Sequence, residues 1–346
     1  MVLQQHISGT SLQLKHNSNG QSWVKCMKFK MMYSFLNTDL QLIEKELEAA
    51  IEADSTVLRE ASLHLLQSGG KRIRPVFVLL GAKFGDYDIH VVKHVAATLE
   101  LIHTASLVHD DVVDDADLRR GSATIKSKWD NRVAMYTGDF IFARALEMMA
   151  VIESPLAHQI LADTMVELCL GEIEQIKDKY NFNQNWRIYF RRIKRKTALL
   201  IASSCQLGAI SAGVDEKIHQ KLFKFGYYVG MSYQITDDIL DFTASEEELG
   251  KPAGSDLIQG NITLPVLIAM EDPKLKRLIE TVREDTSKDE MTHIINAIKS
   301  SGAIEQAARI SDMYLEKAFS ELKGLPAIKA RKTLSDIAKN IGKRKF

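Results

Sequence analysis

Residues 107–114 read Leu-Val-His-Asp-Asp-Val-Val-Asp, and residues 234–241 read Gln-Ile-Thr-Asp-Asp-Ile-Leu-Asp. Each segment carries an Asp-Asp-x-x-Asp pattern among apolar residues at helical spacing. Residues four apart lie on one face of a helix, so the first and third aspartates of each pattern stack one turn apart. The apolar flanks predict that both helices are buried. The six carboxylates are Asp110, Asp111, Asp114, Asp237, Asp238 and Asp241.

Such clusters of like charge are poor structural devices, because carboxylates at this spacing repel one another and a dry cavity strengthens the repulsion. A hard cation relieves the conflict. Mg²⁺ prefers oxygen ligands and commonly takes one or two carboxylates, several waters and phosphate oxygens. The clusters therefore predict a site for Mg²⁺ and a diphosphate. The plainer alternative, a solvated acidic helix face, explains one cluster better than two.

The rest of the chain predicts an all-α fold in a single domain. It has 346 residues, only six prolines and little strand-like alternation. We expect a loosely ordered leader over residues 1–30 and one helical domain over residues 31–346. Apolar residues recur three and four apart in the segments 40–52, 91–113, 161–179 and 217–241.

The charge balance and the cysteines exclude several classes of protein. Lys plus Arg and Asp plus Glu both number 45, so no global basic field favours a nucleic-acid partner. The three cysteines show no metal-ligand spacing, which suits reduced thiols in a cytoplasmic protein. The chain lacks a long uninterrupted apolar run. The basic C-terminus predicts at most a transient membrane contact, and a solvated helix end is the simpler interpretation.

A third motif, Gly69-Gly70-Lys71-Arg72-Ile73-Arg74-Pro75, places cations behind a flexible turn and before a predicted helix. It indicates a phosphate pocket, although a basic helix start on the surface would look similar. It is not a P-loop, which needs an earlier glycine and a Ser or Thr after the lysine.

Further cations and polar residues lie near the aspartate motifs. Arg119 and Arg120 follow the first motif closely enough to address a diphosphate. A similar frame is predicted at the second motif, from Lys196, Thr197, Gln234 and Lys251. His103 lies two helical turns before Asp110, where a packed core histidine is the plainer interpretation.

Together these motifs resemble the trans-isoprenyl diphosphate synthase family over roughly residues 35–346. The resemblance is greatest to catalytic subunits that make a heptaprenyl chain with a small non-identical partner, for the menaquinone side chain. It implies an all-α fold, with a bundle of helices around a deep central cavity. It also implies extension of an allylic diphosphate, such as farnesyl diphosphate, by isopentenyl diphosphate. One departure is Ala123, where the family often has proline.

The resemblance also implies roles for individual residues. The six aspartates would share three Mg²⁺ around the allylic diphosphate. The residues implied to aid them are Arg119, Lys196, Thr197, Gln234 and Lys251. The residues implied to bind isopentenyl diphosphate are Lys71, Arg74, His103 and Arg120.

Product length is predicted to depend on Ala105 and Ser106, one helical turn before the first aspartates. Small side chains there leave room for a long chain, although close packing of helices also favours small residues. Three rivals remain: a homodimeric hexaprenyl or octaprenyl synthase, a non-catalytic partner subunit and a terpene cyclase. The intact pair of Asp-rich motifs disfavours the last two.

Overall fold

The computed structural model describes residues 31–70, 72–119, 121–245 and 252–343. The predicted leader, residues 1–30, lies outside the described residues, and so do Lys71, Arg120 and Lys251. The described chain is almost entirely helical, which confirms the predicted all-α class. Its only described strands form a two-residue hairpin.

The elements of the first half run as follows: η1 (Ser34–Leu36), α2 (Asn37–Ala50), α3 (Thr56–Gln67), α4 (Ile73–Ala82), α5 (Ile89–Val113), β1 (Leu118–Arg119), β2 (Ser122–Ala123), α6 (Ile125–Lys128), α7 (Asn131–Met149) and α8 (Pro155–Lys177). Those of the second half are α9 (Trp186–Ile193), η2 (Lys194–Ala198), α10 (Leu199–Ser211), α11 (Glu216–Thr243), α13 (Ser255–Ile258), α14 (Leu264–Ala269), α15 (Pro273–Ile279), α16 (Lys288–Ser300), α17 (Ala303–Lys323) and α18 (Lys329–Gly342).

Side-chain caps fix where several of these helices begin. Ser154 accepts a hydrogen bond from the Ala157 amide at the start of α8, and Pro155 occupies the first helical position. Ser287 and Glu290 form a reciprocal capping box at α16. The helix starts are therefore largely encoded by local sequence.

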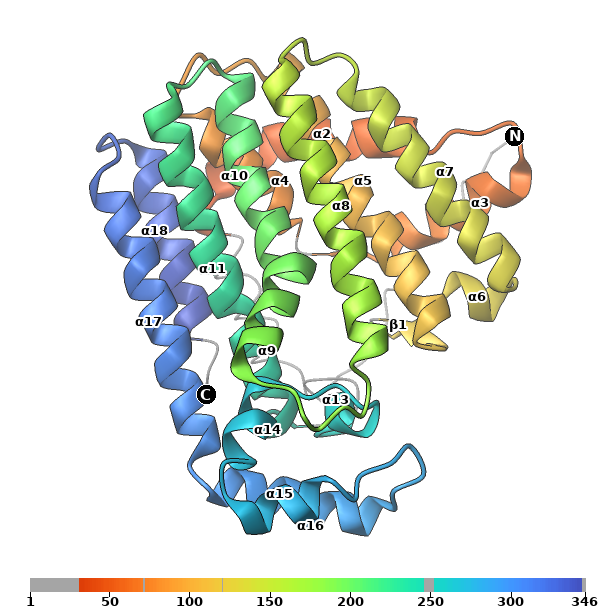
Figure 1. Ribbon diagram of the computed structural model, residues 1–346. Helices are drawn as coiled ribbons and strands as arrows, with labels where there is room; N and C mark the ends of the chain where they lie inside the picture. Colours follow the sequence, from red (N-terminus) through yellow and green to blue (C-terminus); the bar gives the residue numbers. More distant parts are fainter. Residues whose placement is uncertain (1–30, 71, 120, 246–251, 344–346) are drawn as a thin grey trace, which may run out of the picture.

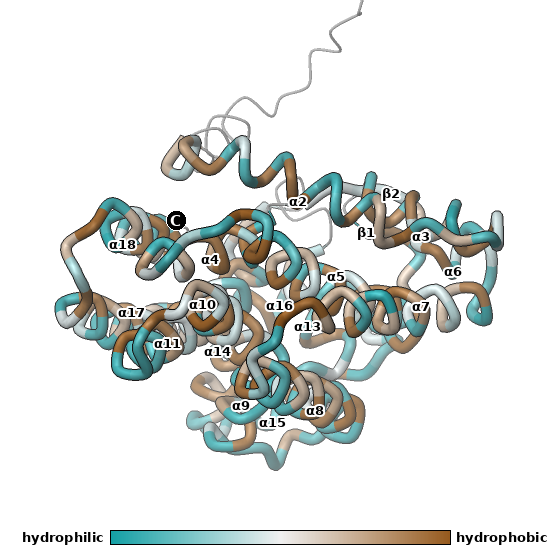
Figure 2. The backbone as a smooth tube through the Cα atoms, turned by 90° about the horizontal axis from the view of Figure 1, so that it is seen from above, coloured by the Kyte–Doolittle hydropathy of each residue, from teal (hydrophilic) through white to brown (hydrophobic). Residues whose placement is uncertain are grey.

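Figure 1 shows α8, α10 and α11 side by side and upright, with α17 and α18 beyond α11, and α15 and α16 crossing below. Seen from above, α10 lies beside α4 (Figure 2), and it also packs against α11 and α8. One apolar core joins α2, α4, α5, α10 and part of α11, and a second surrounds the other part of α11, α14, α16 and α17. The long helix α11 thus belongs to both cores.

Glycine allows the central crossing of α4 and α10. A Cβ atom on Gly208 would lie 2.1 Å from the carbonyl oxygen of Val78, and one on Gly81 would lie 2.2 Å from the carbonyl oxygen of Cys205. Backbones this close exclude any larger side chain. The crossing fixes α10 and hence the segment η2 that precedes it.

One described helix, α5, combines the length and apolar composition of a membrane span, but 67% of its apolar window is buried inside the protein. Burial at that level is typical of a core helix. The aspartates at its C-terminal end are therefore mounted on a rigid support.

Candidate active site

The first aspartate motif lies at the C-terminal end of α5. Asp110 and Asp111 belong to the last turn, whereas Asp114 follows as the capping residue. Each carboxylate contacts a different cation. Asp111 accepts a hydrogen bond from Arg119 Nε at 2.6 Å, Asp114 accepts one from Lys179 Nζ at 3.1 Å, and Asp110 lies 3.7 Å from Lys196 Nζ. Three separate segments therefore neutralise the motif.

The β hairpin explains how Arg119 reaches the motif that precedes it in the chain. Arg119 pairs with Ser122, and Gly121 takes the left-handed conformation at the turn with φ of 79°. The hairpin folds the chain back so that the guanidinium meets Asp111. Burial raises the pKa of Asp111, and the charge of Arg119 opposes that rise.

The second motif, on α11, is more deeply buried than the first. Asp238 and Asp241 are buried, whereas Asp237 is exposed. Asp238 accepts hydrogen bonds from Tyr189 Oη at 2.6 Å and from Gln234 Nε2 at 2.9 Å. Burial, reinforced by the nearby acidic groups, nevertheless raises the pKa of Asp238 to about 8. A cation beside this carboxyl would favour its ionised form.

Asp241 is held by the segment that follows the second motif. Its carboxylate accepts a hydrogen bond from Ser255 Oγ at 3.0 Å and another from the Asp256 amide at 3.2 Å. Its carbonyl oxygen accepts one from the Gly254 amide. The chain around α13 is thereby fixed against the end of α11.

The short π-helix η2 connects the two motifs through adjacent residues. Lys196 donates a hydrogen bond to Glu172 at 2.8 Å and faces Asp110, while Thr197 donates one to Gln234 Oε1 at 2.7 Å. π-helical turns are frequent at functional sites because they re-aim side chains. Lys196 was expected beside the second motif, but it contacts the first. Thr197 and Gln234 make the frame at the second motif.

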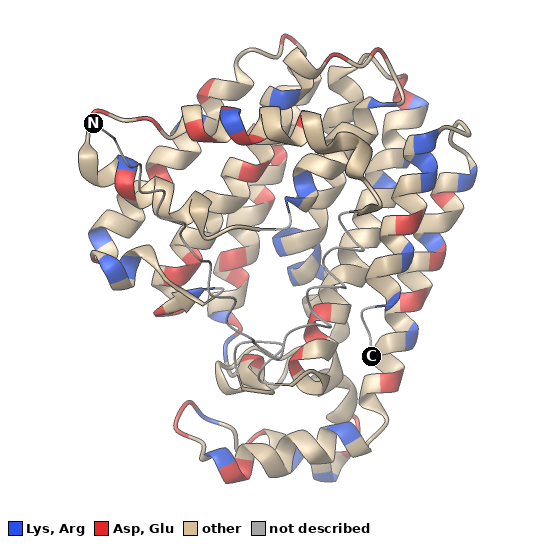
Figure 3. Cartoon of the chain, turned by 180° about the vertical axis from the view of Figure 1, so that it is seen from behind, with Lys and Arg blue, Asp and Glu red and all other residues tan. Residues whose placement is uncertain are grey.

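Viewed from behind, acidic segments lie on both sides of the middle of the molecule with basic segments between them (Figure 3). This pattern matches the contacts of η2. Gly171 on α8 allows η2 to approach, because a Cβ atom there would lie 2.8 Å from Arg195 Cβ. Charges of both signs thus converge where α5, α8, α11 and η2 meet.

A small cavity lies beside the first motif. Its lining includes Gly69, Arg72, Glu100, His103 and Arg119. Of the described residues predicted to bind isopentenyl diphosphate, His103 lines this cavity together with the Gly-Gly turn. Arg74 sits on the first turn of α4 and is not part of the lining.

Arg72 does not serve the cavity as a free cation. It donates hydrogen bonds to Glu44 at 2.7 Å and to the buried Glu100 at 3.1 Å, and it also reaches the carbonyl oxygen of Leu66. Arg72 itself is left-handed, with φ of 46°. Its role here is to attach the turn to α2, α3 and α5.

Three residues of the site are not predicted from the sequence: Glu172, Lys179 and Tyr189. Glu172 resembles any polar residue on an amphipathic helix, and Lys179 resembles an ordinary basic helix end. Tyr189 is fully buried, and nothing in its local sequence indicates a bond to Asp238. The only local signal is Gly171 beside Glu172, which permits close approach of another segment.

The two predicted chain-length residues differ in environment. Ala105 is fully buried in the main core, whereas Ser106 is half-buried and donates a hydrogen bond to the His103 carbonyl at 2.8 Å. Of the two, only Ser106 is partly exposed.

The donor set fits Mg²⁺ held jointly with a phosphate ligand. Within residues 31–343, leaving out the undescribed positions, no three metal-ligating side chains converge into a ready cage. Instead, the motifs offer carboxylate oxygens that must be completed by water and phosphate oxygens, as Mg²⁺ prefers. A bare-ion site of the calcium-cage type is not formed.

Comparisons with known proteins give one consistent result. The family model for polyprenyl synthetases matches residues 55–298. The chain is 64% identical, over 95% of both sequences, to heptaprenyl diphosphate synthase component 2 of Bacillus subtilis. Among solved structures, the heptaprenyl diphosphate synthase of Staphylococcus aureus is 44% identical with a TM-score of 0.86, covering 90% of this chain and 99% of its own.

A second structure bears on the ligands. The polyprenyl synthase of Caulobacter crescentus, solved in complex with calcium and isoprenyl diphosphate, is 31% identical with a TM-score of 0.87. The alignment covers 92% of this chain and 98% of that one. A divalent cation and an isoprenyl diphosphate therefore occur together on this fold.

Proposed function

The chain belongs to the polyprenyl synthetase family, whose members are Mg²⁺-dependent prenyltransferases, and we propose that it is the catalytic subunit of a heptaprenyl diphosphate synthase. It extends farnesyl diphosphate with isopentenyl diphosphate for the menaquinone side chain. The observation that carries this proposal is the convergence of both aspartate motifs on η2, through Lys196 on one side and Thr197 on the other.

In the proposed reaction the allylic diphosphate leaves as pyrophosphate, and the double bond of isopentenyl diphosphate attacks the resulting carbocation before a proton is lost. Bound Mg²⁺, held by the six aspartates, would supply charge neutralisation for the leaving group. Preorganised cations and donors stabilise that same charge, typically by several kcal/mol in total. The residues assigned to this task are Arg119, Lys196, Thr197, Gln234 and Lys251.

The second substrate is assigned to the cavity beside the Gly-Gly turn. His103 lines that cavity together with Gly69 of the Gly-Gly turn, which supports the assignment. Lys71, Arg74 and Arg120 complete the assignment, Lys71 and Arg120 being outside the described residues. Holding the two substrates at adjacent sites aligns the reacting carbons, an effect that can supply much of the rate enhancement.

A small non-identical partner subunit is part of the proposal. The relative in Bacillus subtilis is named as a second component. Exposed apolar residues on α8 recur at helical spacing, at Val166, Leu170 and Ile173. A stripe of this kind is typical of an interface. We assign the partner to this face.

The C-terminal helices support a transient membrane contact for release of the greasy product. A groove of about 730 Å³ runs between α17 and α18. Phe319 and Leu322 give it an apolar floor, and Lys323, Lys329 and Lys332 give it a basic rim, which suits an acidic lipid surface. The protein is otherwise proposed to be cytoplasmic.

Product analysis tests the function directly. Purified chain, with and without the candidate partner, is incubated with farnesyl and isopentenyl diphosphates and Mg²⁺, and the products are sized by chromatography. Heptaprenyl diphosphate formed only with the partner is the expected result. Efficient elongation by the chain alone would favour a homodimeric synthase, and no elongation in either case would refute the proposal.

A further inference from the structure

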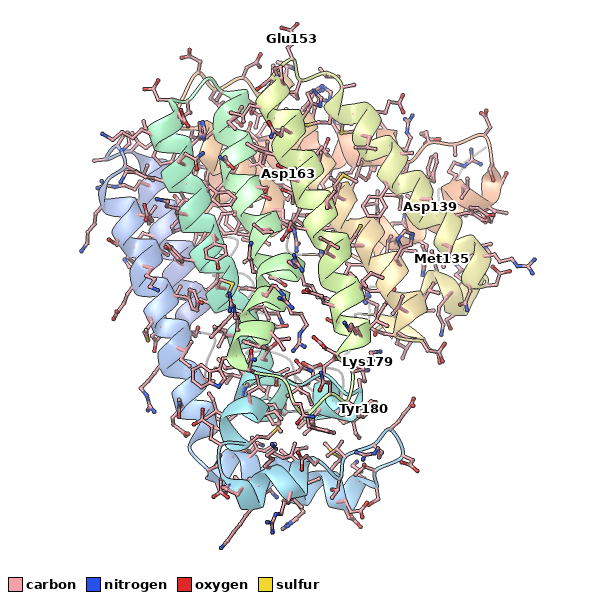
Figure 4. The ribbon with its side chains drawn as sticks, in the orientation of Figure 1. Met135, Asp139, Glu153, Asp163, Lys179 and Tyr180 are labelled. Atoms are coloured by element: carbon pink, nitrogen blue, oxygen red, sulfur yellow. The ribbon has the colours of Figure 1, made fainter. Side chains whose placement is uncertain are left out.

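Lys179 is a cation of the active site that none of the motifs contains. It lies two residues beyond the end of α8, and its Nζ atom is 3.1 Å from Asp114 Oδ1. Figure 4 shows Lys179 and Tyr180 at the lower end of α8, toward α13. The lysine side chain is 28% exposed and that of Asp114 is 24% exposed. The pair therefore sits at the wet edge of the first motif.

Tyr180 fixes the backbone that carries this lysine. Its amide donates a hydrogen bond to the carbonyl oxygen of Gly260 at 2.9 Å, and its hydroxyl donates one to that of Ile258 at 2.5 Å. Its φ of 54° is left-handed, a conformation that non-glycine residues adopt only when their surroundings hold them there. A Cβ atom on Gly260 would lie 2.7 Å from the tyrosine ring. The turn is thus locked against the segment 254–261.

The same segment holds the second motif. Ser255 and the Asp256 amide both bond to the Asp241 carboxylate. One continuous set of contacts therefore runs from Asp114 through Lys179 and Tyr180 to Asp241. The turn that carries Lys179 is therefore linked to both motifs by tertiary contacts.

The charge arrangement indicates what this lysine does. Each aspartate of the first motif has its own cation, and Arg119 and Lys196 are the other two. A lysine is a compact charge with three donors on a flexible stem, so it can exchange one anionic partner for another nearby. Mg²⁺ bound to Asp114 would displace the ammonium, and the closest new anion is the diphosphate that Mg²⁺ brings.

We propose that Lys179 is a diphosphate-binding residue of the allylic site that pairs with Asp114 until metal and diphosphate arrive. The ammonium of Lys179 then bonds to a phosphate oxygen in place of Asp114, and it helps hold the pyrophosphate that leaves. The identity of the substrate in this proposal rests on the proposed function. The exchange of Asp114 for a phosphate oxygen does not depend on it.

The test compares Lys179→Gln with the matched control Lys177→Gln, which changes an exposed lysine in the last turn of α8. In assays that contain the partner subunit, Lys179→Gln is expected to raise the KM for the allylic diphosphate about tenfold, the effect of one lost charged contact, and to leave the KM for isopentenyl diphosphate unchanged. Lys179→Arg should recover most of the loss. The control should behave as the wild type.

A binding measurement without turnover separates this role from a structural one. Calorimetric titration with Mg²⁺ alone should show tighter binding to Lys179→Gln, because the competing ammonium is gone. Titration with inorganic pyrophosphate in saturating Mg²⁺ should show weaker binding. Equal values for Lys179→Gln and Lys177→Gln in both titrations would overturn the proposal, as would equal rises in KM for both substrates.

Failure of the proposed function would look different. The wild type would then not elongate farnesyl diphosphate with or without the partner subunit, and the Lys177→Gln control would share that defect. The two titrations would still decide whether Lys179 exchanges Asp114 for a metal-bound diphosphate.

Discussion

Lys196 Nζ lies 2.8 Å from Glu172 Oε2, and this contact aims the lysine at the first aspartate motif. Burial raises the pKa of Glu172, while the charge of Lys196 opposes that rise. Burial also disfavours the charge of Lys196, but the surrounding acids prevail and raise its pKa. The pair therefore keeps a charged ammonium in a place that would otherwise exclude it.

Replacing Glu172 by Gln should lower kcat by about tenfold or more. Lys196 would lose the carboxylate that orients it, and reaction rates are sensitive to small misplacements of the groups at the reacting centre. Steady-state kinetics measure the effect. Glu167→Gln is the matched control, since Glu167 pairs with Arg195 on the same π-helix. Equal losses in both variants would show that only the packing of η2 matters.

Asp110→Ala and Asp237→Ala should each lower turnover by orders of magnitude at saturating Mg²⁺. Both carboxylates are assigned to the metal, and neither is fully buried. The far-ultraviolet circular dichroism should therefore match that of the wild type. Near-normal turnover by either variant would count against the metal assignment.

Ser106→Phe should shorten the product, because an aromatic ring at this half-buried position would close the path of the growing chain. Ala105→Phe is predicted to do the same, but Ala105 is fully buried and the larger ring should also cost about 1–3 kcal/mol of stability through overpacking. Product chromatography and thermal unfolding separate the two effects. A product of unchanged length from both variants would refute the prediction that the side chains at positions 105 and 106 limit the length of the product.

Gly208→Ala should destabilise the protein by about 2 kcal/mol or more, because its Cβ would meet the Val78 carbonyl oxygen at 2.1 Å. Chemical denaturation measures the change. Gly213→Ala is not a suitable control because Gly213 has φ of 67°. An exposed Ser300→Ala change on α16 is the better comparison and should have little effect.

His219 should make stability depend on pH. Burial lowers its pKa, with Glu216 opposing, and its Nδ1 lies 3.2 Å from Gln206 Nε2, a donor that suits the neutral ring. The unfolded chain therefore takes up the proton first, so stability is present above the unfolded pKa near 6.5 and is lost as pH falls below it. As pH decreases, the midpoint temperature of thermal unfolding should fall less steeply in His219→Gln than in the wild type. The exposed His90→Gln change should leave the slope as in the wild type.

The helical class was readable in the sequence, because apolar spacing acts locally. The pattern over residues 91–113 predicted α5 closely, whereas the pattern over residues 161–179 missed the start of α8 at Pro155. The aspartate motifs were equally clear, since clustered carboxylates on a buried helix need a cation. Asp114 was expected to continue the helix one turn beyond Asp110, but it is the capping residue after Val113.

The partners of those aspartates came only from the tertiary structure. Lys196 faces the first motif, and Arg72 bonds to two glutamates. Glu172, Lys179 and Tyr189 belong to the site, although no pattern in their local sequence indicates it. Sequence alone determined which groups carry the charge, because that is a property of residue type and local spacing. Only the fold decided which charges meet, because contacts between segments tens of residues apart depend on how α5, α8, η2 and α11 pack.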